Sequence, residues 1–508
     1  MSYSRYCTIR IIDEVNCIFI GLHPDHIGYF YEEYGRYAPN YFFNPKFKLG
    51  SWDGKIRYFH KTGKTYVNLL DEIIPAVIGL RYKITIKDER TTKGVTVPLI
   101  GEDFFKHITD PETEEPWEVR DYQIGMVNAL TTHSGGVGLC GTGGGKTSMC
   151  AAIALLYERA ANLRSIIIVP DKNLSDQTVE EYEFFEVDVG EYSGERKDLK
   201  HKHIVSTWQA LQNNPKIIQD FDVVIVDEAH GLRGNVLTKL LNDYGKHIAF
   251  RFGVTGTLPK AETDAMSIRV AVGEVQYTIT AHELITAGHL AKLDIDIIQL
   301  EVDLKDQYAE YLDEFIPTKD HPKPLTYRKF KDAYFPDFQA EKRFHQTEKI
   351  RLDWIANQIE QKRDQGKGNV LCLVDGVNFG KKLTKLVEGA IFLSGKDKMK
   401  DRKEVYNLFK NNNNLVVIAT VQIASVGLNI KRIFNMMFID VGKSFIRVIQ
   451  TIGRSLRKAP DKDHVDVTDI CSDLKYSRKH TAERIKFYKE AEYPYKKRTV
   501  DYSVLGDV

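Results

Sequence analysis

The sequence feature that most constrains the fold is a glycine-rich segment at residues 140–147, which reads CGTGGGKT. Its three successive glycines allow backbone conformations and a close approach that side chains would block. The N–H groups of such a loop form a nest for anions, and a following helix adds the positive end of its dipole. The segment therefore predicts a phosphate-binding loop that leads into a helix of an α/β sheet.

The side chains at the end of this loop predict ATP and Mg²⁺ as cofactors. Lys146 would contact the β- and γ-phosphates, and the Thr147 hydroxyl would bind Mg²⁺. Cys140 stands where the strict GxxxxGK[ST] pattern has glycine, so the match departs from the pattern there. The alternative interpretation is a glycine-rich turn before a helix. The other residues predicted to line the phosphates are Thr142, Gly143, Gly144 and Gly145.

A pair of carboxylates forms the second predicted part of this site. The apolar run Val223–Val226 predicts a buried strand, and Asp227 and Glu228 follow it directly. Asp227 can hold Mg²⁺, while Glu228 can orient and deprotonate an attacking water. His230 would couple this site to neighbouring motifs. An acidic pair after a strand can also be a simple helix cap.

A third string lies more than 300 residues downstream of Lys146, at residues 450–457 (QTIGRSLR). Arg454 and Arg457 are three residues apart, which predicts that they share one face of a helix. Arginine suits the developing charge of phosphoryl transfer because its fork is rigid and always protonated. We predict that these arginines and Gln450 complete a nucleotide site between two lobes. The alternative is a solvated helix face.

Apolar strand-like runs alternate with helical patterns in two long regions of the chain. Several of these runs end at a motif, as expected of parallel sheets that present ligands at the carboxyl ends of their strands. A polar, proline-flanked stretch at 109–116 predicts a linker. We therefore predict three α/β domains, with boundaries at 1–110, 111–295 and 296–508. The predicted strands are Cys7–Ile12, Cys17–Gly21, Tyr82–Ile86, Ser165–Val169, His203–Ser206, Val223–Val226, Phe252–Thr255, Val370–Val374, Ile391–Leu393, Leu415–Ala419, Met436–Ile439 and Val465–Asp469.

Composition limits the classes of protein to consider. The 508 residues are too many for one core. Six scattered cysteines without a CxxC pair predict reduced thiols and no zinc site. No segment has the apolar core of a signal peptide or the ~20 apolar residues of a membrane span. A cytoplasmic protein without a membrane partner is expected.

Because the net charge is only +1, nucleic-acid binding must depend on local basic patches. Residues 46–64 hold six basic residues and one acid, Asp53, with aromatic residues between them. Basic residues can contact phosphates while aromatic rings stack on bases. The alternative is a hairpin whose rings pack inward. A second basic segment, 475–498, is a candidate for DNA binding or lobe packing. The predicted contacts in the first segment are Lys46, Lys48, Trp52, Lys55 and Arg57.

Taken in order, these strings resemble the superfamily 2 helicases and translocases over roughly residues 115–475. The resemblance implies two tandem RecA-like lobes with parallel sheets. It also implies an adenine-side motif, nucleic-acid motifs in both lobes, and a motif that couples hydrolysis to lobe movement. The residues that carry these roles are Arg120 and Gln123 at the adenine side, Pro170, Thr207, Trp208 and Thr420 at nucleic acid, Thr255 and Thr257 in coupling, and Gly427 at the nucleotide. Asn429 stands where many relatives have aspartate.

Residues 43–57 (FNPKFKLGSWDGKIR) resemble the N-terminal domain of the UvsW family of phage helicases. That resemblance implies a small α/β domain ahead of the two lobes. It also implies ATP-driven unwinding or branch migration of forked and junction DNA, in recombination and fork repair. Branched and single-stranded DNA, single-strand-binding proteins and recombination proteins would be its partners. For a viral protein, the compartment would be the host cytoplasm.

Three other functions compete with this one. An RNA helicase shares the DEAH string at 227–230, although no RNA-binding module is recognisable. The motor part of a restriction enzyme would need a nuclease motif, which the sequence lacks. An ATP-gated clamp that does not unwind would not need the complete set of hydrolytic residues. We therefore expect a DNA helicase.

Overall fold

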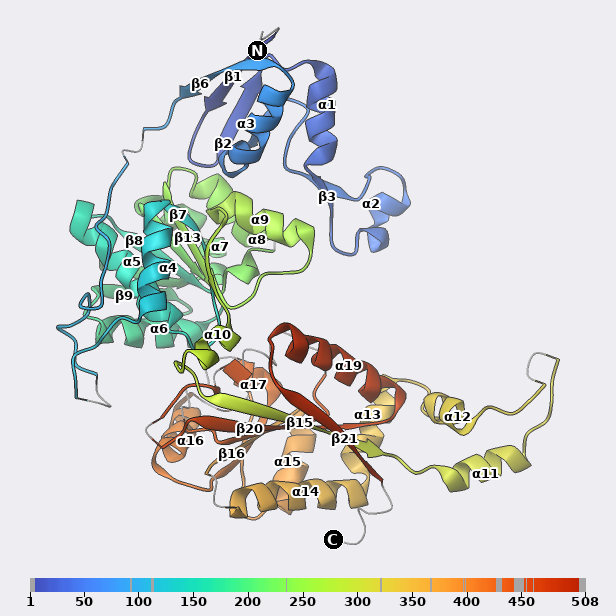
Figure 1. The fold of residues 1–508 in the computed structure, drawn as a ribbon. Helices are drawn as coiled ribbons and strands as arrows, with labels where there is room; N and C mark the ends of the chain where they lie inside the picture. The colour runs from blue at the N-terminus through green and yellow to red at the C-terminus, as the bar shows by residue number, and fades with distance from the viewer. Residues whose placement is uncertain are drawn as a thin grey trace. The chain divides into compact units, whose positions relative to one another are not determined.

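The computed structural model describes residues 5–91, 94–110, 114–233, 235–319, 322–365, 368–395, 397, 399–425, 432–442, 452–453, 455–459 and 461–501 (Figure 1). The chain divides into two compact units. The first comprises Met1–Gly141 and Gly145–Ile279, and the second comprises Thr142–Gly144 and Thr280–Val508. Within the described residues, no helix has the length and apolar character needed to cross a membrane.

The first unit begins with a four-stranded sheet in the order β5-β2-β1-β6. Alternate residues of β1 are buried, so one face of the sheet packs against helices α1 and α3 (Figure 1). A two-stranded sheet, β3-β4, carries the short helices η1 and α2 between its strands. The elements are β1 Arg5–Ile11, β2 Asn16–Ile20, α1 Pro24–Glu33, β3 Gly35–Tyr37, η1 Tyr41–Phe43, α2 Pro45–Lys48, β4 Lys55–Arg57, β5 Lys64–Tyr66, η2 Val67–Leu69, α3 Leu70–Gly79 and β6 Tyr82–Asp88.

This N-terminal domain packs directly on helix α9 (Glu262–Val272) of the same unit. Val270 of α9 belongs to the domain's hydrophobic core. The Tyr58 hydroxyl donates a hydrogen bond to the Thr263 carbonyl at 2.9 Å, and the Asn68 amide donates to the Arg269 carbonyl at 3.0 Å. Arg269 also forms ion pairs with acidic residues at the start of α3. Both apolar and polar contacts therefore hold the domain on α9.

The remainder of the first unit is an eight-stranded sheet, in the order β10-β9-β11-β8-β12-β13-β7-β14. Apart from the antiparallel edge strand β10, its pairs are parallel. Strand β8 is buried along its full length, as its unbroken apolar sequence predicts. The strands are β7 Gly135–Cys140, β8 Ser165–Val169, β9 Val189–Ser193, β10 Arg196–Lys197, β11 His203–Thr207, β12 Val223–Asp227, β13 Phe250–Thr255 and β14 Val275–Ile279. Its helices are α4 Asp121–Thr132, α5 Lys146–Ala161, α6 Lys172–Phe184, α7 Trp208–Asn213, η3 Pro215–Asp220, η4 Ala229–Arg233, α8 Asn235–Lys239 and η5 Leu240–Tyr244.

The second unit is built on a seven-stranded parallel sheet, in the order β17-β18-β16-β19-β20-β15-β21. Its strands are β15 Lys292–Glu301, β16 Val370–Val374, β17 Ile391–Leu393, β18 Val416–Thr420, β19 Asn435–Ile439, β20 His464–Ser472 and β21 Tyr495–Asp501. The predicted fold class is thus confirmed, because two parallel α/β sheets follow a small α/β domain.

Helices surround the second sheet, and α11 and α12 form an arm at one side of this unit (Figure 1). The arm packs through an aromatic and aliphatic cluster that includes Phe330 and Leu474. Arg478 of α19 pairs with Asp332 of α12 at 2.9 Å, so the basic C-terminal helix packs within its own lobe at this point. The helices are α10 Ala281–Thr286, α11 Lys305–Asp313, α12 Tyr327–Tyr334, α13 Phe338–Thr347, α14 Lys349–Asp364, α15 Val377–Leu386, α16 Met399–Asn411, α17 Val421–Ser425 and α19 Lys475–Glu490.

Candidate nucleotide site

The glycine-rich loop joins the carboxyl end of β7 to the first residue of α5, as predicted. Gly143 and Gly145 have φ values of +91° and +79°, in the left-handed region that favours glycine. A Cβ atom at Gly145 would collide with the Gln123 amide. The Lys146 ammonium donates to the Cys140 carbonyl at 3.4 Å, across the loop. The left-handed φ values at two of its glycines are those expected of the predicted anion nest.

The predicted adenine-side residues lie at the start of α4. The Arg120 backbone N–H donates to the Gln123 side-chain oxygen at 3.1 Å, and this bond caps the helix. The Gln123 amide nitrogen lies 3.5 Å from the Ser148 hydroxyl of α5. The Arg120 guanidinium donates to the Tyr122 hydroxyl at 3.2 Å. The structure thus places Gln123 against the glycine-rich loop and Arg120 beside it.

The acidic pair lies at the carboxyl end of β12, which is flanked by β8 and β13. The Glu228 N–H donates to an Asp227 carboxylate oxygen at 2.8 Å, and Glu228 has a φ of +50°. Burial, with the neighbouring Glu228 carboxylate, raises the pKa of Asp227 to about 7, and the Lys146 ammonium opposes the shift. A buried carboxylate of this kind needs a compensating cation to stay ionised. This environment fits Mg²⁺.

The donor set also fits Mg²⁺, because Asp227 and Thr147 offer oxygen atoms. No group of three histidine, cysteine or acidic side chains suitable for a metal gathers among the described residues. Mg²⁺ is commonly held by one or two carboxylates together with substrate phosphates and waters. Asp227 and the Thr147 hydroxyl are the residues that would hold it here.

His230 connects the acidic pair to the next strand. Its Nδ1 atom lies 3.2 Å from a Glu228 carboxylate oxygen and 3.0 Å from the Thr255 hydroxyl, at the end of β13. The Thr255 hydroxyl in turn donates to the Thr257 carbonyl at 3.1 Å. The Nδ1 atom of His230 faces both the Glu228 carboxylate and the Thr255 hydroxyl. A movement of the Glu228 carboxylate would therefore change the hydrogen bond that His230 makes with Thr255. The predicted coupling residues are therefore in direct contact.

Comparisons with known families cover all three parts of this architecture. Residues 7–87 match the family described as "DNA helicase UvsW, N-terminal", and residues 117–260 match "Type III restriction enzyme, res subunit". Residues 350–459 match "Helicase conserved C-terminal domain". The chain is a superfamily 2 helicase.

Two viral proteins are similar to this helicase over most of its length. The ATP-dependent DNA helicase uvsW of Enterobacteria phage T4 is 25% identical, across 91% of this chain and 93% of that protein. Putative helicase 22 of Sulfolobus islandicus filamentous virus is 24% identical, across 74% of this chain and 68% of that protein. A fragment of a putative HsdR subunit of a type I restriction enzyme from Vibrio vulnificus shares the fold, with a TM-score of 0.53, 15% identity, and coverage of 80% of this chain and 72% of that one.

Two predicted nucleic-acid motifs of the helicase meet at the carboxyl edge of the first sheet. Pro170 follows β8, and Thr207 ends β11 and caps α7 by accepting a hydrogen bond from the Ala210 N–H. The Gln209 amide of α7 donates to the Pro170 carbonyl at 3.1 Å. Trp208 packs against the core of this sheet, which gives it a structural contact as well.

In the second unit, the residues predicted for the nucleotide are described only in part. Thr420 is the buried last residue of β18. Gln450, Gly427 and Arg454 lie outside the described residues. Arg457 follows the helical residues 452, 453 and 455 and does not itself lie in a helix, so the predicted shared helical face does not extend to it.

A contact between Lys462 and Arg457 was not predicted from the sequence. The buried Lys462 ammonium donates to the Arg457 carbonyl at 2.9 Å and to the Ser455 carbonyl. Burial lowers the pKa of this lysine to about 7. A lysine between Asp461 and Asp463 gives no signal of burial in the sequence, because its neighbours suggest a solvated turn. The contact fixes the backbone that carries Arg457.

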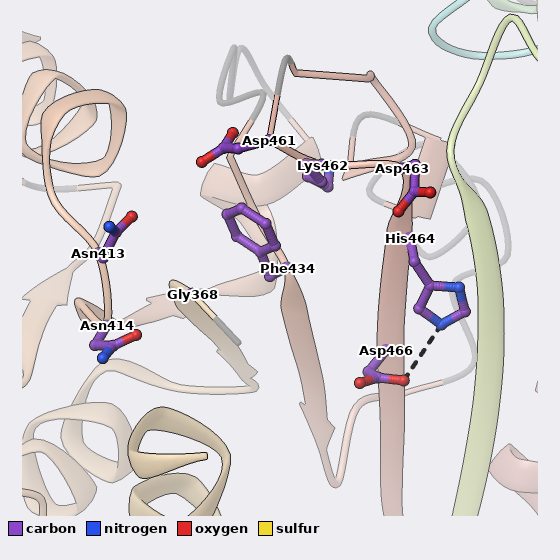
Figure 2. A pocket seen from close by; sticks show the side chains of 9 residues that line it. All are labelled: Gly368, Asn413, Asn414, Phe434, Asp461, Lys462, Asp463, His464 and Asp466. Carbon is purple, nitrogen blue, oxygen red and sulfur yellow. Dashed lines mark ion pairs between the residues drawn. The ribbon is translucent and has the colours of Figure 1, made fainter. Parts of the chain in front are cut away.

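A pocket of 580 Å³ lies in the second unit (Figure 2). Its lining residues Gly368, Phe434 and Lys462 precede β16, β19 and β20, respectively. The pocket therefore lies at the amino ends of these parallel strands, whereas Thr420 lies at a carboxyl end. His464 and Asp466 form an ion pair in its wall at 3.4 Å.

In the basic segment at residues 46–64, some cations form ion pairs with acidic residues and others are exposed. Lys55 forms an ion pair with Glu32 of α1 at 3.0 Å, and Arg57 contacts both Glu32 and Asp53. The Arg57 side chain is only 8% exposed, so its geometry favours a structural role over a phosphate contact. The Trp52 ring nitrogen donates to the Lys55 carbonyl at 2.9 Å. Lys46 and Lys48, on α2, are exposed.

The His230 contacts lead to a test of coupling. We expect His230→Ala to leave ATP hydrolysis measurable and to reduce the base pairs unwound per ATP by about 2- to 30-fold, the effect of losing about 0.5–2 kcal/mol of coupling. Parallel ATPase and unwinding assays measure the ratio. His201→Ala, a surface histidine in the same lobe, is the matched control. An unchanged ratio for His230→Ala would contradict the coupling role.

Proposed function

We propose that this protein is an ATP-driven DNA helicase that unwinds or branch-migrates forked and junction DNA. The single observation that carries the proposal is the UvsW-type N-terminal domain packed on α9, the helix that follows the Thr255–Thr257 coupling motif. The similarity to a helicase of phage T4 across 91% of the chain supports it.

The geometry supports different roles for the residues of the nucleotide site. The loop N–H groups and the Lys146 ammonium would bind the phosphates, while Asp227 and Thr147 would hold Mg²⁺. When bound, Mg²⁺ would neutralise charge on the phosphate oxygens. Glu228 would accept a proton from the attacking water, since its carboxylate lies at the same strand end as Asp227. His230 would hold that carboxylate in position.

The same contacts suggest how ATP hydrolysis is coupled to movement of the bound DNA. A change at Glu228 shifts His230 and Thr255, and the chain from β13 continues through Thr257 into α9. Because the N-terminal domain packs on α9, movement of this helix carries the DNA-binding domain with it. The exposed Lys46 and Lys48 of that domain are suited to phosphate contacts along a duplex arm.

A comparison of nucleic acids as activators tests the function. We expect steady-state ATPase activity to be stimulated most by forked or four-way DNA, less by plain duplex or single strands, and least by RNA of the same design. Labelled strands followed in parallel report unwinding. Equal or greater stimulation by RNA would contradict the DNA assignment. Tight fork binding without strand separation would instead identify an ATP-gated clamp.

A further inference from the structure

A group of large apolar side chains in the N-terminal domain projects into solvent between β3 and β4. Phe42 and Phe43 of η1 are 50% and 68% exposed, and Leu49 at the end of α2 is 81% exposed. The rings of Phe42 and Phe43 lie 4.4 Å apart, centroid to centroid. We call Phe42 and Phe43 the aromatic tip. Neighbouring exposed apolar side chains of this size mark an interaction surface.

The aromatic tip stands on a rigid base. The Tyr41 ring stacks on Tyr37 at 4.6 Å and meets Phe47 edge-on at 4.8 Å. Gly54 has a φ of +82°, and a Cβ atom there would collide with the Tyr41 ring. The Ala38 N–H donates to the Gly54 carbonyl at 2.8 Å. These contacts fix the backbone that carries Phe42 and Phe43, which lowers the entropic cost of binding.

The charge around the aromatic tip indicates the chemistry of its partner. Residues 38–52 contain Lys46 and Lys48 and no acidic residue. Both lysines are exposed on α2, the helix that begins immediately after Asn44. Exposed rings beside exposed ammonium groups suit unpaired bases and their phosphates, since every base has a face on which a ring can stack. Bases within a duplex are already stacked, so the branch point offers the accessible ones.

The base of the tip is also connected to α9. The Thr263 hydroxyl donates to the Tyr37 carbonyl, and Arg36 pairs with Glu262 at 3.3 Å. Because Tyr37 is the residue on which Tyr41 stacks, these contacts connect the base of the tip to α9. A base held by the tip would therefore move with the helix that follows the coupling motif.

We propose that the aromatic tip stacks on unpaired bases at the branch point of forked or junction DNA, with Lys46 and Lys48 on the adjacent phosphates. This inference rests on the proposed function and specifies the contact that recognises the branch point.

A double variant tested on two forks separates base stacking from other contacts. Phe42→Ala/Phe43→Ala is compared with wild type on a fork with normal branch-point nucleotides and on a fork with abasic branch-point sites. We expect the double variant to bind the normal fork at least about 5-fold and up to about 160-fold more weakly, the range for one lost base–ring stack of ~1–3 kcal/mol. On the abasic fork, it should match wild type. Tyr29→Ala, 55% exposed on α1, is the control and should bind both forks normally.

Salt dependence gives a second, independent readout. Lys46→Ala/Lys48→Ala should flatten the log–log salt slope of fork binding by ~2, at ~0.9 for each lost phosphate contact. Phe42→Ala/Phe43→Ala should leave that slope unchanged, because it removes no charge. Thermal melting of each variant verifies that the domain is folded.

The proposal is overturned if the double variant binds the normal fork as tightly as wild type, which would assign the tip to a protein partner. An equal loss on the normal and abasic forks overturns it too, because the lost contact would not involve bases. The failure of the proposed function has a different signature: wild-type ATPase would then respond no better to forks than to RNA. If forks stimulate the wild-type ATPase but the double variant binds forks as tightly as wild type, the role of the aromatic tip is refuted and the proposed helicase function is not.

Discussion

Arg457→Ala should reduce DNA-stimulated ATP hydrolysis by about 10³- to 10⁵-fold, the range for loss of an arginine finger. We propose that this guanidinium contacts the γ-phosphate as charge develops on it. The Arg457 carbonyl is held by Lys462, so the backbone that carries this side chain is already fixed. Steady-state ATPase with saturating fork DNA measures the effect.

The neighbouring Lys458→Ala is the matched control, because Lys458 is an exposed cation one residue away. It should hydrolyse ATP at the wild-type rate. Arg457→Lys should recover only part of the activity, since lysine keeps the charge and loses the fork geometry. If Arg457→Ala retained wild-type turnover, the arginine would have no role at the phosphate.

Glu228→Gln and Lys146→Ala should fail at different steps. Glu228→Gln keeps Asp227 and Lys146, so it should bind ATP normally and hydrolyse it about 10²- to 10⁴-fold more slowly, as expected for loss of a general base. Lys146→Ala removes the main cationic contact to the terminal phosphates, so it should bind ATP weakly. Equilibrium binding of a fluorescent ATP analogue and single-turnover hydrolysis distinguish the two defects.

Glu195→Gln, an exposed carboxylate of the same lobe, controls for the loss of a negative charge and should behave as wild type. Normal turnover by Glu228→Gln would exclude it as the base, and tight ATP binding by Lys146→Ala would exclude its phosphate contact.

Strands that are buried on both faces and have unbroken apolar sequences could be predicted from the sequence almost to the residue, whereas the buried strand β9, which contains Glu191, was not predicted. Ser165–Val169 and Val370–Val374 coincide with β8 and β16, because unbroken apolar runs between polar turns have few other structures open to them. Strands β15 and β21 were not predicted. Asp294 and Asp296 interrupt the apolar pattern of β15, and β21 is an edge strand whose lysines are exposed. These segments form strands because they pair with segments that are distant in the sequence, and the local sequence pattern carries no information about that pairing.

The same limit applies to the candidate site. Motif patterns predicted the positions of the loop and of the acidic pair, because these residues lie at strand ends of one parallel sheet. The contacts that His230 makes with Glu228 and Thr255 were not predicted. The count of charged residues in 46–64 did not reveal that Glu32, on helix α1, pairs with Lys55 and Arg57 of strand β4. Nor could the buried position of Lys462 be read from a chain segment rich in charge. Ion pairs between distant elements were the part that the sequence could not supply.

The packing of the N-terminal domain on α9 determines how chimeric helicases should be built. Val270 lies in the core of that domain, and Arg269 pairs with Asp71 and Glu72. A junction near residue 110 would therefore separate a domain from part of its own core and leave the apolar side of α9 bare. An exchange of N-terminal domains between relatives should transfer α9 together with residues 5–88, because these segments share one hydrophobic core and a set of ion pairs.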